Sequence, residues 1–250
     1  MLEITHYGDS SATPALLIVH GLYGSARNWG VLAKRLADTR AVVTVDMRNH
    51  GNSPWHDSHS YDDMASDLAE VIAKLGTVDL LGHSMGGKAA MVAALNAAPL
   101  RRLVIADIAP VAYGHSQIQY IEAMRQVDLS VVSKRSDAEA QLRPLVDDPA
   151  LASFFLQSLD VREKRWKLNL DVLAAEMPKV LSFPEVSGQF DGPTLFLSGA
   201  ESDYVRPEHR ADIRALFPAA RFAKIPGAGH WLHAEKPREF EAAVRVFLDA

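Results

Sequence analysis

Short apolar runs recur along the chain and are separated by longer polar stretches. These runs occupy residues 14–20, 41–46, 77–83, 102–107, 194–199 and 221–227. Near-continuous apolar runs of this length are typical of strands that are buried on both faces, as in a parallel sheet. We therefore predict one strand in each run.

Between these runs the apolar positions follow a helical period. Residues 61–75 carry Met64, Leu68 and Ile72, the spacing of a helix that buries one face. Asp62 at the start of this stretch favours a helix N-terminus. Strands that alternate with helices predict an α/β fold, with a mostly parallel, doubly wound sheet.

The alternation stops between about Tyr113 and Gln189, where the pattern is helical and no convincing strand is present. It resumes at Pro193. We expect residues 1–113 and 190–250 to form the two parts of one core, and residues 114–189 to form an inserted helical cap.

Composition narrows the class of protein. The 250 residues include 48% hydrophobic and 23% charged residues, which suits one globular α/β domain with an insertion. The net charge of −5, without a long basic block, argues against a nucleic-acid partner. The sequence shows no signal-peptide pattern and no apolar run of about 18 residues, so we expect a cytoplasmic protein without membrane insertion. The absence of cysteine excludes disulfides, thiolate zinc sites and cysteine-based catalysis.

A serine stands where the predicted strand 77–83 turns into an alanine-rich helical stretch. Gly82 to Gly86 reads G-x-S-x-G around Ser84. In a nucleophile elbow, a sharp strand-to-helix turn exposes the serine hydroxyl, and the small residues two positions away avoid a collision. The glycine spacing does not match a dinucleotide-binding or phosphate-binding loop. We therefore predict that Ser84 is a nucleophile.

A serine nucleophile needs a base, and His230 is the best candidate. It follows the last predicted strand on a Pro-Gly-Ala-Gly loop. We expect His233, His83 and His20 to be structural. His56 and His59 resemble a metal cluster, but their loop composition favours a solvated turn, so we expect no metal site.

Two aspartates follow predicted strands and are candidates for the acid that orients His230. Asp203 follows the strand that precedes the histidine segment, and Asp107 follows the strand after the elbow helix. Spacing alone favours Asp203. Each residue has an alternative structural interpretation, in which Asp203 caps the helix beginning at Pro207 and Asp107 holds the start of the cap.

Acyl transfer also needs N–H donors for the developing oxyanion. The segment His20 to Gly24, HGLYG, ends the first long apolar run, and its glycines let the backbone approach a substrate. We expect the backbone N–H groups of Leu22 and Met85 to be the donors.

Taken together, the segments VHGLYGS, DMRNHGNS, GHSMGGKAAM, DIAPV, SDYV and GAGHWLHAEKP resemble the α/β-hydrolase superfamily. More closely, they resemble the YbfF-type small carboxylesterases. The resemblance covers nearly the whole chain except about residues 115–185, where it is weaker. It implies an α/β-hydrolase fold with a helical lid, an acyl-serine mechanism on short-chain esters, and no metal or organic cofactor. It also implies Asp107 as the acid, since esterases of this kind take the acid from the segment that matches DIAPV.

These observations predict a carboxylesterase that acts on a small-molecule acyl ester. An acyl-CoA thioesterase is the alternative, with a cationic mouth supplied by Arg162, Lys164, Arg165 and Lys167. A non-catalytic receptor that uses the same cavity is a third possibility, and the complete set of nucleophile, base and acid argues against it. The cap residues Phe154, Phe155 and Trp166 are candidates for the acyl pocket, although core packing is the more common role of buried aromatics.

Overall fold

A computed structural model describes residues 1–9 and 14–250 of the chain. A seven-stranded sheet forms its centre, in the order β1-β3-β2-β4-β5-β8-β9. The strands are β1 (Ile4–Tyr7), β2 (Leu16–Val19), β3 (Val42–Val45), β4 (Val78–His83), β5 (Leu100–Ala106), β8 (Thr194–Gly199) and β9 (Ala220–Ile225). Each of the six apolar runs forms a strand, and these six pair in parallel. The prediction of a mostly parallel sheet is confirmed.

Strand β1 was not expected from the sequence. It pairs antiparallel with β3, with Ile4 opposite Val45 and Tyr7 opposite Val42. Its residues are half-buried or exposed, because β1 lies at the edge of the sheet. A short edge strand with polar positions leaves no apolar run for the sequence to reveal.

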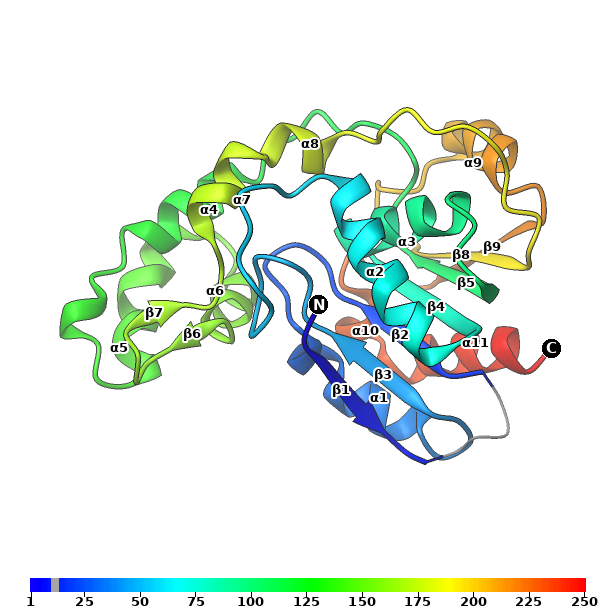
Figure 1. Ribbon diagram of the computed structural model, residues 1–250. Coiled ribbons are helices and arrows are strands. Elements are labelled where there is room, and N and C mark those ends of the chain that lie inside the picture. Colours follow the sequence, from blue (N-terminus) through cyan, green and yellow to red (C-terminus); the bar gives the residue numbers. More distant parts are fainter. Residues whose placement is uncertain (10–13) are drawn as a thin grey trace.

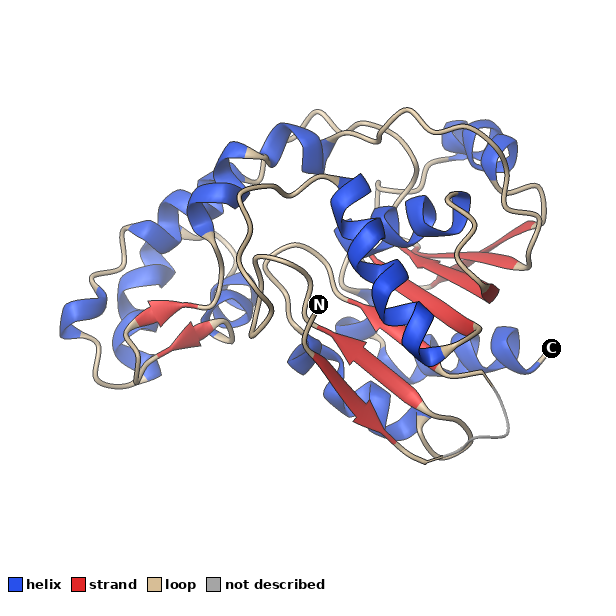
Figure 2. Ribbon diagram, viewed as in Figure 1, coloured by secondary structure: helices blue, strands red, loops and turns tan. Residues whose placement is uncertain are grey.

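Helices cover both faces of the sheet (Figure 2). One buried cluster joins the sheet to α2 (Tyr61–Leu75), α3 (Met85–Leu95) and α9 (Arg210–Leu216). The other joins it to α1 (Gly30–Leu36), α10 (Leu232–Glu235) and α11 (Pro237–Asp249). Short 3₁₀ helices occupy Ala26–Trp29, Leu129–Val131, Arg143–Leu145 and Pro207–His209. In the described part of the chain, no helix is both long enough and apolar enough to cross a membrane.

The register of the sheet brings several loops to one edge. Gly82 in β4 lies opposite Val19 in β2 and Ile105 in β5, and Ala106 lies opposite Leu197 in β8. Parallel strands end on the same side of a sheet, so the loops that follow them meet there. Ligands of open α/β sheets bind in the crevice at this edge.

The segment between β5 and β8 extends away from the sheet. In Figure 1 its helices α4 to α7 lie to the left of the sheet, and α8 leads back towards it. These helices are α4 (Ile118–Arg125), α5 (Arg135–Leu142), α6 (Pro149–Leu156), α7 (Leu170–Ala175) and α8 (Met177–Leu181). We call residues 114–189 the inserted segment. Its proposed role as a separate cap stays a prediction.

The expectation that the inserted segment contains no strand is wrong. Strands β6 (Leu159–Asp160) and β7 (Arg165–Trp166) form an antiparallel hairpin. The next helix, α7, begins only at Leu170, where the Asn169 side chain accepts the N–H of Val172. Two-residue strands are too short to produce a periodic pattern, so the sequence did not show them.

Candidate active site

The turn between β4 and α3 is sharply bent at Ser84. The backbone of this residue has φ 53° and ψ −121°, a conformation that residues other than glycine rarely adopt. A β-carbon on Gly82 would lie 2.3 Å from the carbonyl oxygen of Gly86, and one on Gly86 would lie 2.4 Å from that of His20. Glycine is therefore required on both sides of the serine, as the elbow interpretation predicts.

The loop after β9 brings His230 to Ser84. The Nε2 atom of His230 lies 3.0 Å from Ser84 Oγ, and its Nδ1 atom lies 2.8 Å from Asp107 Oδ2. A carboxylate only accepts hydrogen bonds, which assigns the Nδ1 proton to the bond with Asp107. The Nε2 atom is then an acceptor that faces the serine hydroxyl. This arrangement can remove a proton from Ser84.

The carboxylate of Asp107 is fully buried and has three donors. Besides His230, it accepts the N–H of Gly199 at 3.1 Å and the hydroxyl of Ser202 at 2.5 Å. Asp203 is exposed, and its backbone carbonyl accepts Nε–H of Arg206 at 3.1 Å. The structure therefore brings Asp107 to His230 and leaves Asp203 outside this hydrogen-bonded chain.

Two further side chains hold His230, and sequence reasoning gave neither of them this role. The ring of Tyr204 stacks on the His230 ring at 3.9 Å between centroids and 19° between planes. The buried His83 donates from Nε2 to the backbone carbonyl of His230 at 2.9 Å. Tyr204 and Ser202 both flank Asp203 in the SDYV segment, so a search for acids alone overlooks them.

The predicted oxyanion donors line the same cavity as Ser84. The carbonyl of Gly21 accepts Nδ1–H of His20 at 2.8 Å and the N–H of Gly24 at 3.0 Å. Within residues 1–9 and 14–250, the N–H groups of Leu22 and Met85 donate no hydrogen bond, and both residues line the cavity. Both amides are thus available to a substrate oxygen.

Buried neutral histidines support the neighbouring loops. Burial lowers the pKa of His20 to about 4 and the pKa of His50 to about 3. The Nε2 atom of His20 accepts the N–H of Met47 at 2.9 Å, and that of His50 accepts the N–H of Tyr23 at 3.1 Å. A neutral imidazole has one donor and one acceptor nitrogen. In both rings Nε2 is the acceptor, and Nδ1 donates to a backbone carbonyl.

The other histidines are structural or exposed in the structure. His233 is stacked on Trp29 at 4.2 Å between ring centroids, and burial lowers its pKa to about 3. His56 is exposed, but His59 is fully buried with its Nε2 atom 3.3 Å from Met85 Sδ. The solvated-turn interpretation is therefore wrong for His59, because this loop folds back onto Met85. No grouping of three or more His, Cys, Asp or Glu suited to a metal ion occurs among the residues described.

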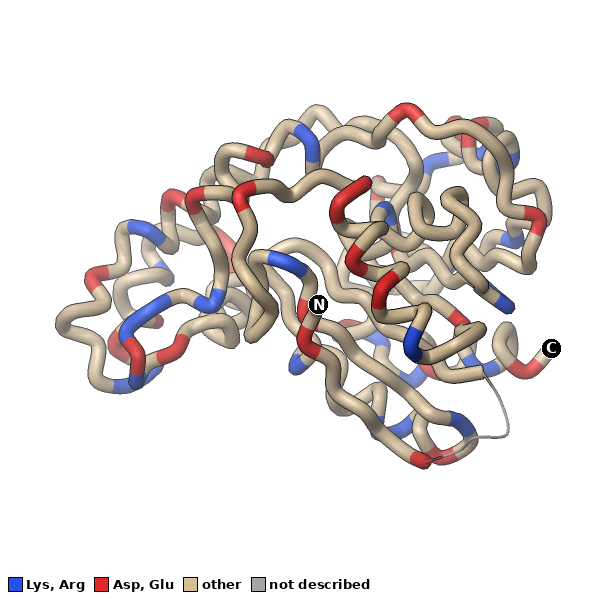
Figure 3. Tube along the Cα trace, viewed as in Figure 1, with Lys and Arg blue, Asp and Glu red and all other residues tan. Residues whose placement is uncertain are grey.

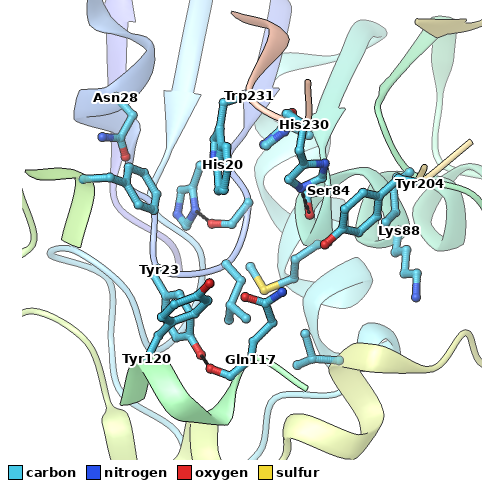
Figure 4. A pocket seen from close by; sticks show the side chains of 18 of the residues that line it. His20, Tyr23, Asn28, Ser84, Lys88, Gln117, Tyr120, Tyr204, His230 and Trp231 are labelled. Carbon is cyan, nitrogen blue, oxygen red and sulfur yellow. Dashed lines mark hydrogen bonds between the residues drawn. The ribbon is translucent and has the colours of Figure 1, made fainter. Parts of the chain in front are cut away.

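A cavity of about 290 Å³ lies over Ser84 and is bounded by the sheet loops and the inserted segment. Figure 4 shows Ser84, His230 and Trp231 on one side and Gln117 and Tyr120 on the other. The aromatic candidates Phe154 and Phe155 line it. The third candidate, Trp166, does not belong to the described lining, and its Nε1–H donates to the Met124 carbonyl at 3.0 Å.

The four cations considered for binding CoA lie on or beside the β6–β7 hairpin. Lys164 Nζ donates to the Ser130 carbonyl, and Lys167 Nζ donates to Asn52 Oδ1 at 3.0 Å. None of the four is among the described residues that line the cavity. Figure 3 shows acidic and basic residues interspersed along the trace of the inserted segment. A cationic mouth at the cavity is therefore not supported.

The chain is similar to several known proteins over most of its length. A model described as the alpha/beta hydrolase family matches residues 16–243. The sn-1-specific diacylglycerol lipase ABHD11 of Mus musculus is 42% identical over 254 residues, which cover 96% of this chain and 83% of the relative. The esterase YbfF of Escherichia coli (strain K12) is 38% identical over 240 residues, which cover 94% of this chain and 92% of the relative. A solved structure described as a marine microorganism esterase has a TM-score of 0.93 and 37% identity, and the match covers 98% of each chain.

The matched family model spans the sheet from β2 to β9, the elbow and the histidine loop, and the relatives match the chain over nearly its full length. The resemblance inferred from the sequence motifs is confirmed. This chain belongs to the alpha/beta hydrolase family.

Proposed function

We propose that this protein is a serine esterase in which Ser84, His230 and Asp107 act together. The observation that carries the proposal is a chain of two hydrogen bonds. Ser84 Oγ lies 3.0 Å from His230 Nε2, and His230 Nδ1 lies 2.8 Å from the Asp107 carboxylate. Such a chain can activate a hydroxyl that is otherwise a weak nucleophile. A receptor would have no use for this proton path.

The reaction proceeds in two halves. Ser84 Oγ attacks the ester carbonyl as His230 Nε2 takes its proton, and the N–H groups of Leu22 and Met85 hold the oxyanion. The alcohol leaves with the proton from His230, and the acyl group stays on Ser84. Water then loses a proton to His230 and attacks the acyl-serine. The carboxylic acid is released as the proton returns to Ser84.

The substrate class follows from the cavity. A space of about 290 Å³ with aromatic walls suits a small acyl ester rather than a polymer or a nucleic acid. Relatives named as esterases and as a diacylglycerol lipase support an ester as the substrate. We propose short-chain carboxylic esters, with residues 114–189 as a cap over the site. An acyl-CoA thioester is the weaker alternative, because Arg162, Lys164, Arg165 and Lys167 lie away from the cavity.

A graded panel of substrates tests the proposal. We expect p-nitrophenyl esters of short acids to be cleaved faster than long-chain esters and faster than the matching CoA thioesters. Ser84→Ala should lower kcat by a factor on the order of 10⁶ while the circular dichroism spectrum is unchanged. Near wild-type turnover by this variant would contradict the mechanism, and faster cleavage of the thioesters would contradict the substrate class.

A further inference from the structure

The ammonium group of Lys88 lies at the end of α8, the last helix of the inserted segment. Lys88 follows Ser84 by one turn of α3 and is 1% exposed. Its Nζ atom donates to the carbonyl of Leu181 at 3.2 Å and to that of Ser182 at 2.5 Å. These carbonyls belong to the last residue of α8 and to the residue that follows it, so Lys88 joins the last helix of the inserted segment to the helix that carries Ser84.

The entry of the inserted segment reaches the same point. The N–H of Tyr113 donates to the Leu181 carbonyl at 2.9 Å, and Lys88 Nζ lies 4.8 Å from the centre of the Tyr113 ring. On the other side, the hydroxyl of Tyr61 in α2 donates to the Val180 carbonyl at 2.6 Å. The last carbonyls of a helix have no partner within it. Here they receive donors from α2, α3 and the entering chain.

No carboxylate accompanies this buried charge. In the part of the chain that the structure describes, the partners of Lys88 are two carbonyl oxygens and the faces of two tyrosine rings. Burial lowers the pKa of the ammonium to about 7. A buried cation is costly unless its contacts compensate, and an apolar side chain would fill the space without that cost. The contacts with the carbonyls are therefore what distinguishes lysine at this position.

This cluster is also connected to the proposed active site. Lys88, Tyr61, Tyr113 and Leu181 all line the cavity over Ser84. The hydroxyl of Tyr113 donates to the backbone carbonyl of Tyr204 at 2.7 Å. Tyr204 stacks on His230, and Figure 4 shows Lys88 among the side chains that line the same cavity. A displacement at Lys88 would therefore move one wall of the cavity.

We propose that Lys88 is a positioning residue that fixes the entry of the inserted segment and the end of its last helix to α3, and so sets the width of the acyl cavity. The inference rests on the proposed function, because the cavity is taken to hold the acyl group. Lys88 takes no part in the proton transfers. Its loss should weaken substrate binding far more than it slows the chemical step.

Hydrogen exchange of Lys88→Met tests the contact directly. Methionine keeps an unbranched apolar side chain but has no ammonium donors. We expect the amides of Tyr113 and Ser182 to exchange about tenfold faster, because two charged hydrogen bonds are lost. The amide of Leu81 in β4 should be unaffected. Lys179→Met is the matched control, since Lys179 also belongs to α8 but is exposed and pairs with Glu176.

The kinetic readout separates positioning from general destabilisation. In Lys88→Met, KM for a short p-nitrophenyl ester should rise about tenfold with kcat within about threefold, since binding rather than the transition state is affected. Unchanged exchange at Tyr113 and Ser182, or an equal acceleration at Leu81, would overturn the proposal. A fall in kcat at unchanged KM would also overturn it.

A milder variant guards against a failure to fold. If Lys88→Met yields no folded protein, Lys88→Gln, which keeps a shorter polar donor in place of the ammonium, is measured for exchange at Tyr113 and Ser182 and for KM and kcat, and the same outcomes decide. If the wild type cleaves no ester, the proposed function fails, while the exchange comparison still tests the contact. If it cleaves esters and the exchange rates do not change, only the positioning role of Lys88 fails.

Discussion

The loops after β5 and β8 each carry an aspartate, and they use it differently. In the first loop, Asp107 is fully buried, and its carboxylate accepts three hydrogen bonds. In the second, Asp203 is exposed, and its neighbours Ser202 and Tyr204 face the site instead. Both loops follow parallel strands and therefore lie at the same edge of the sheet.

This difference shows that position along the chain does not reveal which aspartate contacts His230. The second loop contributes a hydroxyl that holds the carboxylate of the first, and a ring that stacks on the histidine. A buried carboxylate needs such donors to replace its lost hydration. In the proposed mechanism, the loop after β8 therefore supports the acid that the loop after β5 supplies.

Exchanging each carboxylate for an amide tests the difference between the two aspartates most strongly. Asp107→Asn should lower kcat roughly 10⁴-fold, because an asparagine does not hold the imidazole in the tautomer that accepts the serine proton. The measurement is steady-state cleavage of a short p-nitrophenyl ester.

The matched control for Asp107→Asn is the second aspartate. Asp203→Asn should change kcat by no more than about twofold, the range of an exposed substitution away from specific contacts. A large loss in Asp203→Asn, with near-normal turnover in Asp107→Asn, would reverse the assignment of the acid.

A smaller effect should come from the support that the second loop gives. Ser202→Ala removes one hydrogen bond to the Asp107 carboxylate, worth about 1.5 kcal/mol, which corresponds to a decrease in kcat of about tenfold. KM should change little, because Ser202 does not line the described cavity. Ser187→Ala, an exposed serine of the inserted segment, is the control. Equal kcat values for the two variants would show that Ser202 does not contribute.

The sheet was predictable because burial on both faces leaves an apolar run for each central strand. The edge strand β1 and the β6–β7 hairpin were not predictable in this way. Their short stretches gain stability from neighbours that are distant in sequence, such as Val45 beside Ile4 and Met124 beside Trp166. Local periodicity does not contain such contacts.

The placement of Ser84 beside His230 was predictable because the elbow and the glycine loop impose requirements on nearby residues. The choice between Asp107 and Asp203 depended on a family resemblance, since both follow strands and only tertiary burial separates them. Tyr204 and Lys88 were recognised only from the structure. Tyr204 stacks on a ring and Lys88 donates to carbonyls that are both distant in sequence, and such contacts produce no pattern in the neighbouring residues.

Trapping the acyl-enzyme tests the central claim most directly. Wild type and Ser84→Ala are mixed with p-nitrophenyl acetate, quenched in acid before the steady state, and digested for peptide mass spectrometry. The account predicts one acetyl group on Ser84 of the wild type and no corresponding modification in Ser84→Ala. Turnover with no acetyl group on Ser84, or with the acetyl group on another residue in both proteins, would contradict it.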